Sequence, residues 1–248
     1  MIVKIVIAGL ILGLVGVSAA VAGPHLDGKV YGPYVENGVF ELEARGAQVN
    51  GGPLDGARTT VLEAEYGFSD RLSLALVAPI ANDPGNGAKL QGVGVEGVYY
   101  LGQIPKLGVD VGLYGEYLTG VNGGEEVVEA KLLMAKRSGP FEGVLNLVVE
   151  RPLNVPSERF ANYSYAAAVT WEVADHLRLG VESFGDLGDD YGLQSGGAYA
   201  GPVAQWEFHP KGAPLEIELR ASWLAALGSS RDDADSQVRL SVGLERRF

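Results

Sequence analysis

Carboxylate side chains are the residues of this chain with the most obvious capacity for chemistry. A pair such as Glu41 and Glu43 has the residue types of a general acid and a general base. In an extended strand, however, residues i and i+2 point to the same face, so the spacing alone accounts for the pair. Histidine is scarce: His25 lies in the N-terminal tail, and His176 and His209 fall at turns, away from any obvious nucleophile. We therefore expect no catalytic residue and no cofactor, and an enzyme is the least favoured class.

Aspartates cluster twice in polar segments, and carboxylate oxygens are the ligands that calcium accepts. Neither cluster has the spacing of the twelve-residue calcium loop, so the sequence predicts solvated loop charge and no specific metal site. The two clusters are Asp186, Asp189 and Asp190, and Asp232, Asp233 and Asp235.

The elements that carry these residues are extended segments in which apolar and polar residues alternate. This pattern gives a strand one apolar face and one polar face. About twelve such segments divide the chain, each of about ten residues. They are residues 40–45, 60–68, 72–78, 93–101, 109–117, 128–134, 145–150, 163–171, 177–182, 199–208, 215–223 and 237–248.

The connections between these segments alternate in length. Short turns are expected near 69–70, 104–106, 138–140, 174–176 and 210–212, and longer polar loops near 49–57, 81–90, 120–125, 152–159, 185–196 and 226–236. An even strand number with short turns at one end and long loops at the other is typical of transmembrane β-barrels. We therefore predict an all-β fold, an antiparallel transmembrane barrel of about twelve strands.

The N-terminus reads as a secretory signal peptide. Lys4 provides an early positive charge, residues 5–17 form an apolar core, and Ala20-Val21-Ala22 is a small-x-small cleavage site. The apolar run is short for a transmembrane helix, which needs about 20 residues. We expect a signal peptide over 1–22, a periplasmic or plug segment over 23–37, and the barrel over 38–248.

Composition agrees with this organisation. The net charge of −12 argues against nucleic acid as a partner. The mean hydropathy of +0.11 is far below that of a helical membrane protein, but it suits a barrel whose strands have one polar face. The chain has no cysteine, and a closed strand ladder needs no disulfide.

The register of the alternation assigns the charged faces to the lumen, because a carboxylate that faces lipid is costly. The expected lumen-lining residues are Glu41, Glu43, Arg45, Glu63, Glu65, Glu96, Asp110, Tyr114, Glu116, Glu129, Lys131, Glu150, Arg178, Glu182, Glu216, Glu218, Arg220 and Arg239. Aromatic residues would form girdles at the two membrane interfaces. They are Tyr66, Phe68, Tyr99, Tyr117, Tyr163, Trp171, Trp206, Phe208, Trp223 and Phe248.

Two stretches carry a family resemblance. Residues 30–43 lead into the first strand, and residues 65–72 close the first hairpin. Together they resemble proteobacterial outer-membrane barrels that are grouped loosely with transporter-like proteins of aromatic degradation pathways, and the terminal Phe248 resembles the ending of outer-membrane β-barrels in general. The resemblance implies the barrel fold and the outer membrane of a Gram-negative bacterium, and it transfers no substrate or site residue. It also implies that the assembly machinery of outer-membrane barrels reads the C-terminal strand.

We expect a passive channel for small solutes with an acidic, cation-attracting lumen. The alternative is a structural or binding barrel whose lumen is closed by ion pairs such as Glu43 with Arg220 or Arg239, acting through its external loops. A soluble secreted β-barrel or sandwich with an apolar interior is a further alternative. Other expected partners are outer-membrane lipid and lipopolysaccharide, whose divalent ions the loop aspartates could bridge.

Overall fold

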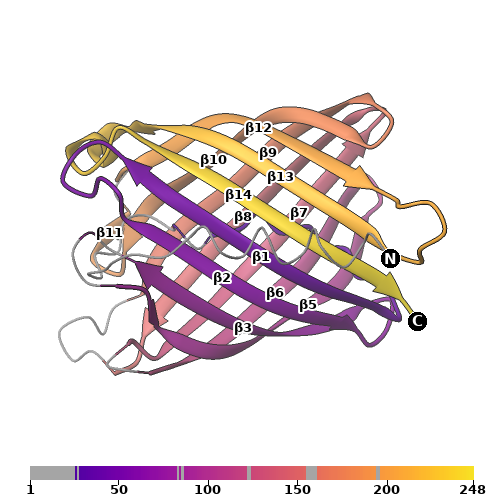
Figure 1. The fold of residues 1–248 in the computed structure, drawn as a ribbon, viewed down its shortest axis with the longest axis horizontal. Helices are drawn as coiled ribbons and strands as arrows, with labels where there is room; N and C mark the ends of the chain where they lie inside the picture. The colour runs from indigo at the N-terminus through magenta and orange to yellow at the C-terminus, as the bar shows by residue number, and fades with distance from the viewer. Residues whose placement is uncertain are drawn as a thin grey trace.

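The computed structural model describes residues 26, 28–82, 84, 87–121, 124–154, 161–193 and 196–248, and the predicted signal peptide lies outside them. Twelve long strands and two short ones form one antiparallel sheet (Figure 1). The long strands are β1 (Val39–Asn50), β2 (Arg58–Gly67), β3 (Leu72–Asn82), β5 (Gly92–Ile104), β6 (Val109–Gly120), β7 (Val127–Ser138), β8 (Phe141–Pro152), β9 (Asn162–Ala174), β10 (Leu177–Asp189), β12 (Ala198–Phe208), β13 (Glu216–Leu227) and β14 (Ser236–Arg247). The short strands are β4 (Lys89–Leu90) and β11 (Gly192–Leu193), and a 3-10 helix, η2, spans Gly228–Asp232.

The sheet closes because its first and last strands pair. β1 and β14 are antiparallel over their whole length, from Val39 opposite Arg247 to Asn50 opposite Ser236. Each of the other long strands pairs with the long strands that precede and follow it in the sequence. The short strands β4 and β11 pair with β3 and β10. The prediction of a closed antiparallel barrel of twelve strands is therefore confirmed.

One connection is shorter than the sequence indicates. A loop was expected over 185–196, but β10 continues to Asp189 and pairs with Asn162 of β9. The pairing of β9 with β10 shifts register between Asp186 and Gly188. Such a bulge interrupts the alternation of inward and outward side chains, so the alternation does not reveal that β10 continues to Asp189.

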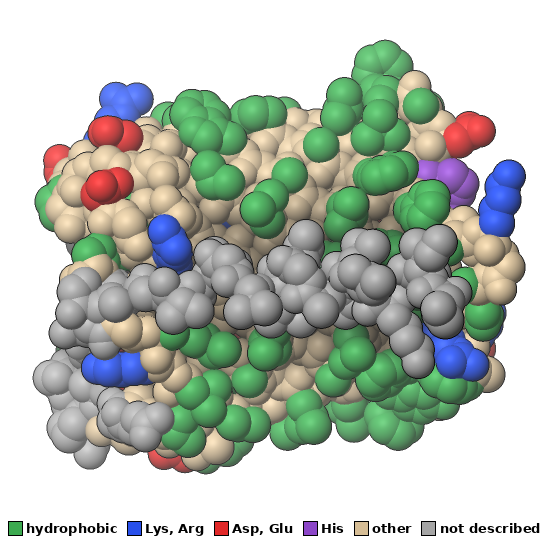
Figure 2. Space-filling view, in the orientation of Figure 1, with side chains coloured by type: hydrophobic (Ala, Val, Ile, Leu, Met, Phe, Trp, Pro, Cys, Tyr) green, Lys and Arg blue, Asp and Glu red, His purple; other side chains and the backbone are tan. Residues whose placement is uncertain are grey.

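The two faces of the sheet invert the usual arrangement of a water-soluble protein. The outward side chains of Leu76, Leu240 and Val169 are 60%, 60% and 57% exposed, whereas Glu63 and Glu96 are 4% and 2% exposed. Figure 2 shows hydrophobic side chains over the middle of the barrel wall and charged ones toward its two ends. An apolar outer band with charged groups inside suits surrounding hydrocarbon, and it contradicts the alternative of a soluble barrel with an apolar interior. No described helix has the length and hydropathy needed to cross a membrane.

The barrel has two different rims. Five short connections lie at one rim, here called the short-turn rim, at residues 68–71, 105–108, 139–140, 175–176 and 209–215. The chain between β1 and β2 and the η2 helix lie at the opposite, long-loop rim. β1 begins at the short-turn rim, so the residues that directly precede it lie at that rim.

Candidate functional site

Residues 28–37, here called the inner segment, run inside the barrel ahead of β1. Tyr31 is 5% exposed and makes a reciprocal pair with Asn146 of β8. The Tyr31 backbone N–H donates to Asn146 Oδ1, and Asn146 Nδ2 donates to the Tyr31 carbonyl oxygen, both at 2.8 Å. The Tyr31 hydroxyl reaches a different wall, where it donates to Glu96 Oε1 of β5 at 3.2 Å. The inner segment is thus fastened across the lumen.

Cationic side chains surround this tyrosine. Lys29 Nζ lies 2.5 Å from Glu43 Oε2 and 3.6 Å from Glu63 Oε1. Arg45 pairs with Glu63 and also donates from Nη2 to the Tyr31 hydroxyl at 3.4 Å. Lys131 Nζ lies over the Tyr31 ring at 4.3 Å from its centroid. Buried carboxylates of the wall are therefore neutralised partly by the inner segment itself, as buried charges require.

The inner segment spans the length of the lumen. Near the short-turn rim, Arg137 stacks over the Tyr34 ring at 4.5 Å, and Arg247 pairs with Glu36. Pro33 is fully buried against Gly112 of β6, where a Cβ would lie only 3.0 Å from the proline. Farther along, Arg239 Nη1 donates to the Gly28 carbonyl oxygen at 2.8 Å.

An apolar cluster closes the lumen under part of the long-loop rim. Leu26 and Val30 pack against it from inside, and Leu54 packs against it from the loop between β1 and β2. Its buried members are Val49, Ala57, Ala166, Phe184, Tyr199, Leu224, Ala226 and Ala234. Water and ions would have to pass this rim elsewhere.

Three cavities lie along the barrel interior. One of about 410 Å³ at the short-turn rim shares Arg137, Glu142, Arg178 and Glu207 with a second of about 300 Å³. The second shares Gly28 and Arg45 with a third of about 90 Å³, which ends near Leu118, Val127 and Glu150. These last residues lie in the long-loop halves of β6, β7 and β8. The cavities therefore follow one another from the short-turn rim to the long-loop halves of β6–β8, and Gly28 with Arg45 lies between the second and the third.

The charge of the lining varies along this series. The middle cavity has six cationic and six carboxylate side chains in its lining, so its wall is balanced. The cavity at the short-turn rim has Glu142, Glu172, Asp175 and Glu207 against Arg137 and Arg178. The smallest cavity has Glu116, Glu129 and Glu150 against Arg45 and Lys131. Carboxylates are in excess only at the two ends.

The ion pairs across the wall differ from those expected. Arg220 of β13 pairs with Glu182 of β10, which also accepts from the Ser222 hydroxyl at 2.5 Å. Glu43 pairs with Lys29 and Arg45. The expectation of Glu43 with Arg220 is thus wrong, because Lys29 of the inner segment occupies the position beside Glu43 and Glu182 lies closer to Arg220.

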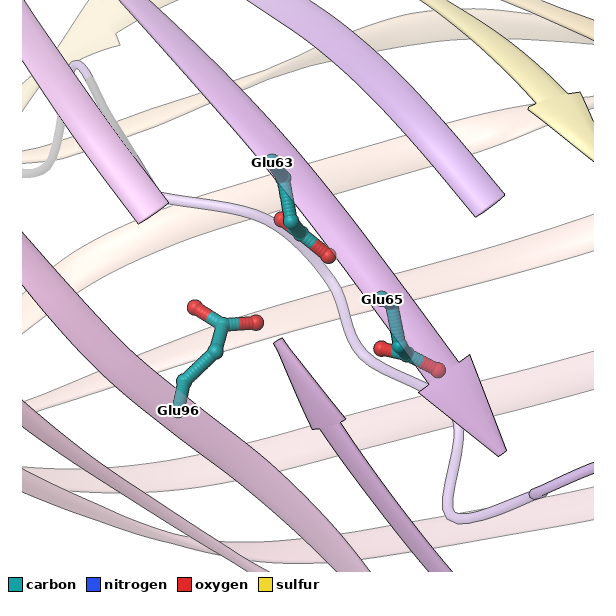
Figure 3. Close-up of side chains that lie close together, drawn as sticks. All are labelled: Glu63, Glu65 and Glu96. Atoms are coloured by element: carbon teal, nitrogen blue, oxygen red, sulfur yellow. The ribbon is translucent and has the colours of Figure 1, made fainter. Parts of the chain in front are cut away.

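Three carboxylates meet on the wall between β2 and β5. Figure 3 shows Glu63 and Glu65 on one strand and Glu96 on the other, with their oxygens turned toward one another. One oxygen from each lies within 4.8 Å of the others, a spacing that a metal ion could bridge. Arg45 and Lys29 already pair with Glu63, and Tyr31 and Tyr114 donate to Glu96, at 3.2 and 2.8 Å. Protein groups thus already contact two of the three carboxylates, although Glu63 Oε1 accepts no hydrogen bond from the described residues.

The remaining expected lumen residues divide by position. Asp110 and Glu216 lie near the short-turn rim, where Asp110 accepts from the Tyr100 hydroxyl at 2.7 Å and Glu216 pairs with His209. The residues that line the middle or smallest cavity are Glu41, Glu43, Arg45, Tyr114, Glu116, Glu129, Lys131, Glu150, Arg178, Glu182, Glu218, Arg220 and Arg239.

The expected girdle residues are mostly exposed on the outer wall. Phe141 stacks on Trp171 and Trp206 packs against Phe208, each pair with ring centroids 5.7 Å apart. The members with exposed side chains are Phe68, Tyr99, Tyr117, Trp171, Trp206, Phe208, Trp223 and Phe248, and Tyr66 and Tyr163 are partly exposed.

The aspartates of the loops have local structural roles. Asp190 accepts from the Ala161 backbone N–H at 2.9 Å and from the Tyr163 hydroxyl at 2.7 Å, and these bonds hold the pKa of its carboxyl below the usual range. Asp189 accepts from the Tyr191 backbone N–H at 2.8 Å. Both aspartates therefore order the ends of β9 and β10.

Sequence reasoning missed several residues of the interior. Lys29 and Tyr31 belong to a segment whose position the sequence leaves open, and Arg137 and Glu142 lie just beyond the ends of the alternating segments used to assign faces. Glu207 lies within the segment 199–208, between Trp206 and Phe208, but it is not among the expected lumen residues. Asn146 carried a usable signal, since it alternates with Leu145 and Leu147 and is the polar residue of a short apolar run.

Comparison with solved structures supports the barrel assignment. The fold is similar to that of an outer membrane channel from Pseudomonas putida F1, with 13% identity, a TM-score of 0.58, and coverage of 86% of this chain and 97% of that one. A KdgM porin in complex with disordered oligogalacturonate matches with 10% identity, a TM-score of 0.56, and coverage of 84% and 99%. The NanC porin matches with 12% identity, a TM-score of 0.52, and coverage of 84% and 100%. No family model matches the chain, and no curated protein matches it. At these identities the similarity concerns the fold, which is that of outer-membrane β-barrels.

Proposed function

We propose that this protein is a passive channel for small solutes in the outer membrane of a Gram-negative bacterium. The observation that carries the proposal is the series of three cavities, joined by shared lining residues, that extends from the short-turn rim to the long-loop halves of β6–β8. The similarity of the fold to porins and outer-membrane channels supports a transport role over an enzymatic one. In this proposal a solute passes the boundary at Gly28 and Arg45 between the middle and the smallest cavity.

The solutes that best fit this pathway are small cations or neutral molecules. Carboxylates exceed cations at both end cavities, and rings of acidic residues attract cations. The balanced middle cavity adds little net field of its own. The proposed acidity of the lumen is thus concentrated at its ends.

The test is conductance of the purified protein in planar lipid bilayers under a salt gradient. We expect discrete single-channel steps and a reversal potential that shows preference for potassium over chloride. The double variant Glu116→Gln and Glu150→Gln should reduce that preference, because it neutralises two carboxylates of the smallest cavity. A matched control is Asp70→Asn, which removes a carboxylate at an exposed turn outside the cavities. Folded protein that conducts no ions would contradict the proposal.

A sealed structural or binding barrel is the second candidate. The apolar cluster below the long-loop rim and the inner segment across the lumen favour it. It predicts a silent bilayer even after the contacts of the inner segment are weakened, whereas a channel should conduct more. The same recordings therefore separate the two functions.

The remaining assignments accompany this proposal. They are a signal peptide at residues 1–22 and recognition of β14 and Phe248 by the assembly machinery. They also include contact of the long-loop rim with lipopolysaccharide, and membership of the transporter-like barrel family that residues 30–43 and 65–72 resemble. Phe248 is 74% exposed, as such recognition requires. Its backbone N–H donates to the Gly38 carbonyl oxygen at 2.9 Å, which fastens the C-terminus beside the start of β1.

A further inference from the structure

Two imidazole rings meet at the short-turn rim. His176 lies in the turn between β9 and β10, and His209 directly follows β12. β10 and β12 are hydrogen-bonded neighbours, with Leu177 opposite Trp206, so the ends of these strands lie side by side. The two ring centroids are 5.0 Å apart, and the ring planes meet at 53°. Figure 2 shows histidine side chains exposed at this end of the barrel.

The backbone at His176 has a left-handed conformation, which is uncommon for residues other than glycine. Its φ is +63°, and it is the one non-glycine residue with positive φ in the described part of the chain. Three other turns of the same rim place glycine in such a conformation, at Gly108, Gly139 and Gly212. A residue with a Cβ is disfavoured there, where glycine is the usual choice. Histidine thus stands where the other turns of this rim place glycine, although histidine is among the residues that adopt positive φ most readily after glycine.

Each imidazole also has a carboxylate beside one of its nitrogens. His209 Nε2 lies 3.0 Å from Glu216 Oε2, and His176 Nδ1 lies 3.8 Å from Glu207 Oε2. The Glu207 backbone N–H also donates to the His176 carbonyl oxygen at 2.9 Å, which ties the two strand ends together. Histidines that bind metals commonly donate one ring N–H to a carboxylate and use the other nitrogen as the ligand. This arrangement leaves Nε2 of His176 and Nδ1 of His209 as the candidate ligand atoms.

The spacing of the rings suits a shared ion. Two imidazoles bound at about 2 Å to one tetrahedral ion have ring centroids about 5 Å apart, which is the separation observed here. Both histidine side chains are about half exposed, so an ion can reach them from solvent. His176 also lines the cavity of about 410 Å³ at this rim, so the two rings lie beside its mouth.

We propose that His176 and His209 together bind one divalent transition-metal ion at the short-turn rim. Imidazole ligands select zinc, copper and nickel over calcium or magnesium. Water completes the coordination. A bound ion links the turn before β10 to the end of β12 and adds positive charge at the mouth of the cavity.

The test measures metal binding directly and does not depend on conductance. Full-length protein without an affinity tag, refolded in detergent and stripped of metals, is titrated with zinc by calorimetry and with cobalt by absorption spectroscopy. We expect one site per chain, and cobalt bands in the visible range that are typical of tetrahedral coordination. Calcium should not compete.

The variants are chosen to keep the fold. His176→Gly removes the imidazole and places glycine where φ is positive, so the turn should be retained or stabilised. His209→Gln removes the second ring. We expect each to weaken zinc binding at least about tenfold, and Glu216→Gln to weaken it about 10- to 100-fold through loss of orientation. Asp70→Asn at another short turn is the matched control and should bind zinc normally.

Two results would overturn the proposal. One is wild-type protein that binds neither zinc nor cobalt at millimolar concentration. The other is binding that persists unchanged in the double variant of His176→Gly and His209→Gln, which would place the ion elsewhere, for example at Glu63, Glu65 and Glu96. Heat-dependent mobility in detergent gels verifies that each variant forms the barrel.

Discussion

Asn146 and Tyr31 exchange two hydrogen bonds of 2.8 Å, in which the side chain of one residue satisfies both backbone groups of the other. Asn146 is completely buried, and 115 positions separate it from Tyr31. The Asn146 carboxamide thus makes the backbone hydrogen bonds that a neighbouring strand would make in a sheet. A buried backbone group without such a partner is costly, so this side chain helps to keep the inner segment in the lumen.

Replacing Asn146 by alanine should release the inner segment locally. The change leaves the Tyr31 N–H and carbonyl without these partners, at a cost of about 2 to 4 kcal/mol in docking free energy. We expect faster hydrogen exchange at the Tyr31 amide, measured by mass spectrometry, and larger conductance steps. Ser164→Ala is the control, because Ser164 is also buried on the inner face of the neighbouring strand β9. Unchanged exchange in the Asn146 variant would show that other contacts suffice to hold the segment.

Lys29→Met should make the pathway more selective for cations. The lysine Nζ lies 2.5 Å from Glu43 and 3.6 Å from Glu63, and Arg45 is the other cationic side chain that pairs with both carboxylates, so removal of the lysine leaves them with less positive charge nearby. Reversal potentials in bilayers should then shift toward the potassium equilibrium value, with conductance equal to or above that of the wild type. Lys106→Met, at an exposed turn, removes the same charge far from these carboxylates. A shift of equal size in the control would attribute the effect to net charge alone.

Arg220→Met should destabilise the barrel by about 3 to 5 kcal/mol, because it leaves the buried carboxylate of Glu182 without its cation. The double variant with Glu182→Gln removes that uncompensated charge and should recover most of the loss. Urea unfolding in lipid vesicles, followed by tryptophan fluorescence, measures both. If the double variant were as unstable as the sum of the single variants, the two residues would not be coupled.

Leu76→Arg should destabilise the folded barrel by about 2 to 4 kcal/mol, as expected for arginine on the lipid face near the bilayer midplane. Leu76 is 60% exposed and lies in the middle of β3. Leu107→Arg is the matched control, since Leu107 is equally exposed but lies in a short turn, where the cost should fall to about 0 to 1 kcal/mol. Equal costs at both positions would argue against a membrane band around β3. Vesicle unfolding is again the measurement.

The wall of the barrel could be predicted from the sequence because its signal is local. Leu74 and Leu76 face outward and Ser73 and Ala75 inward by strand geometry alone, whatever the rest of the chain does. The same rule gives the strand number and the order of short and long connections. It fails at β10, where the bulge between Asp186 and Gly188 interrupts the alternation.

The contents of the barrel could not be predicted in the same way. Whether Lys29 or Arg220 pairs with Glu43 depends on which side chains lie at the same level along the barrel axis. It also depends on the inner segment, which pairs with no strand. The sequence left two positions open for residues 23–37. Tyr31 and Tyr34 favour packing of that segment, but nothing local specifies Asn146 as the partner of Tyr31. Similarly, the proximity of His176 and His209 follows from the pairing of β10 with β12, which histidine spacing alone does not reveal.

The seam between β1 and β14 has a consequence for how the molecule is made. The wall is complete only when the last strand joins the first, and the inner segment is covalently attached to the first. Residues 28–37 must therefore already lie between the curling strands when the two ends of the sheet meet, or they must be threaded afterwards through a rim that Arg247 and Glu36 help to occupy. The first route requires no opening of the finished cylinder, so the order of assembly, and not a later docking event, would decide what the lumen contains.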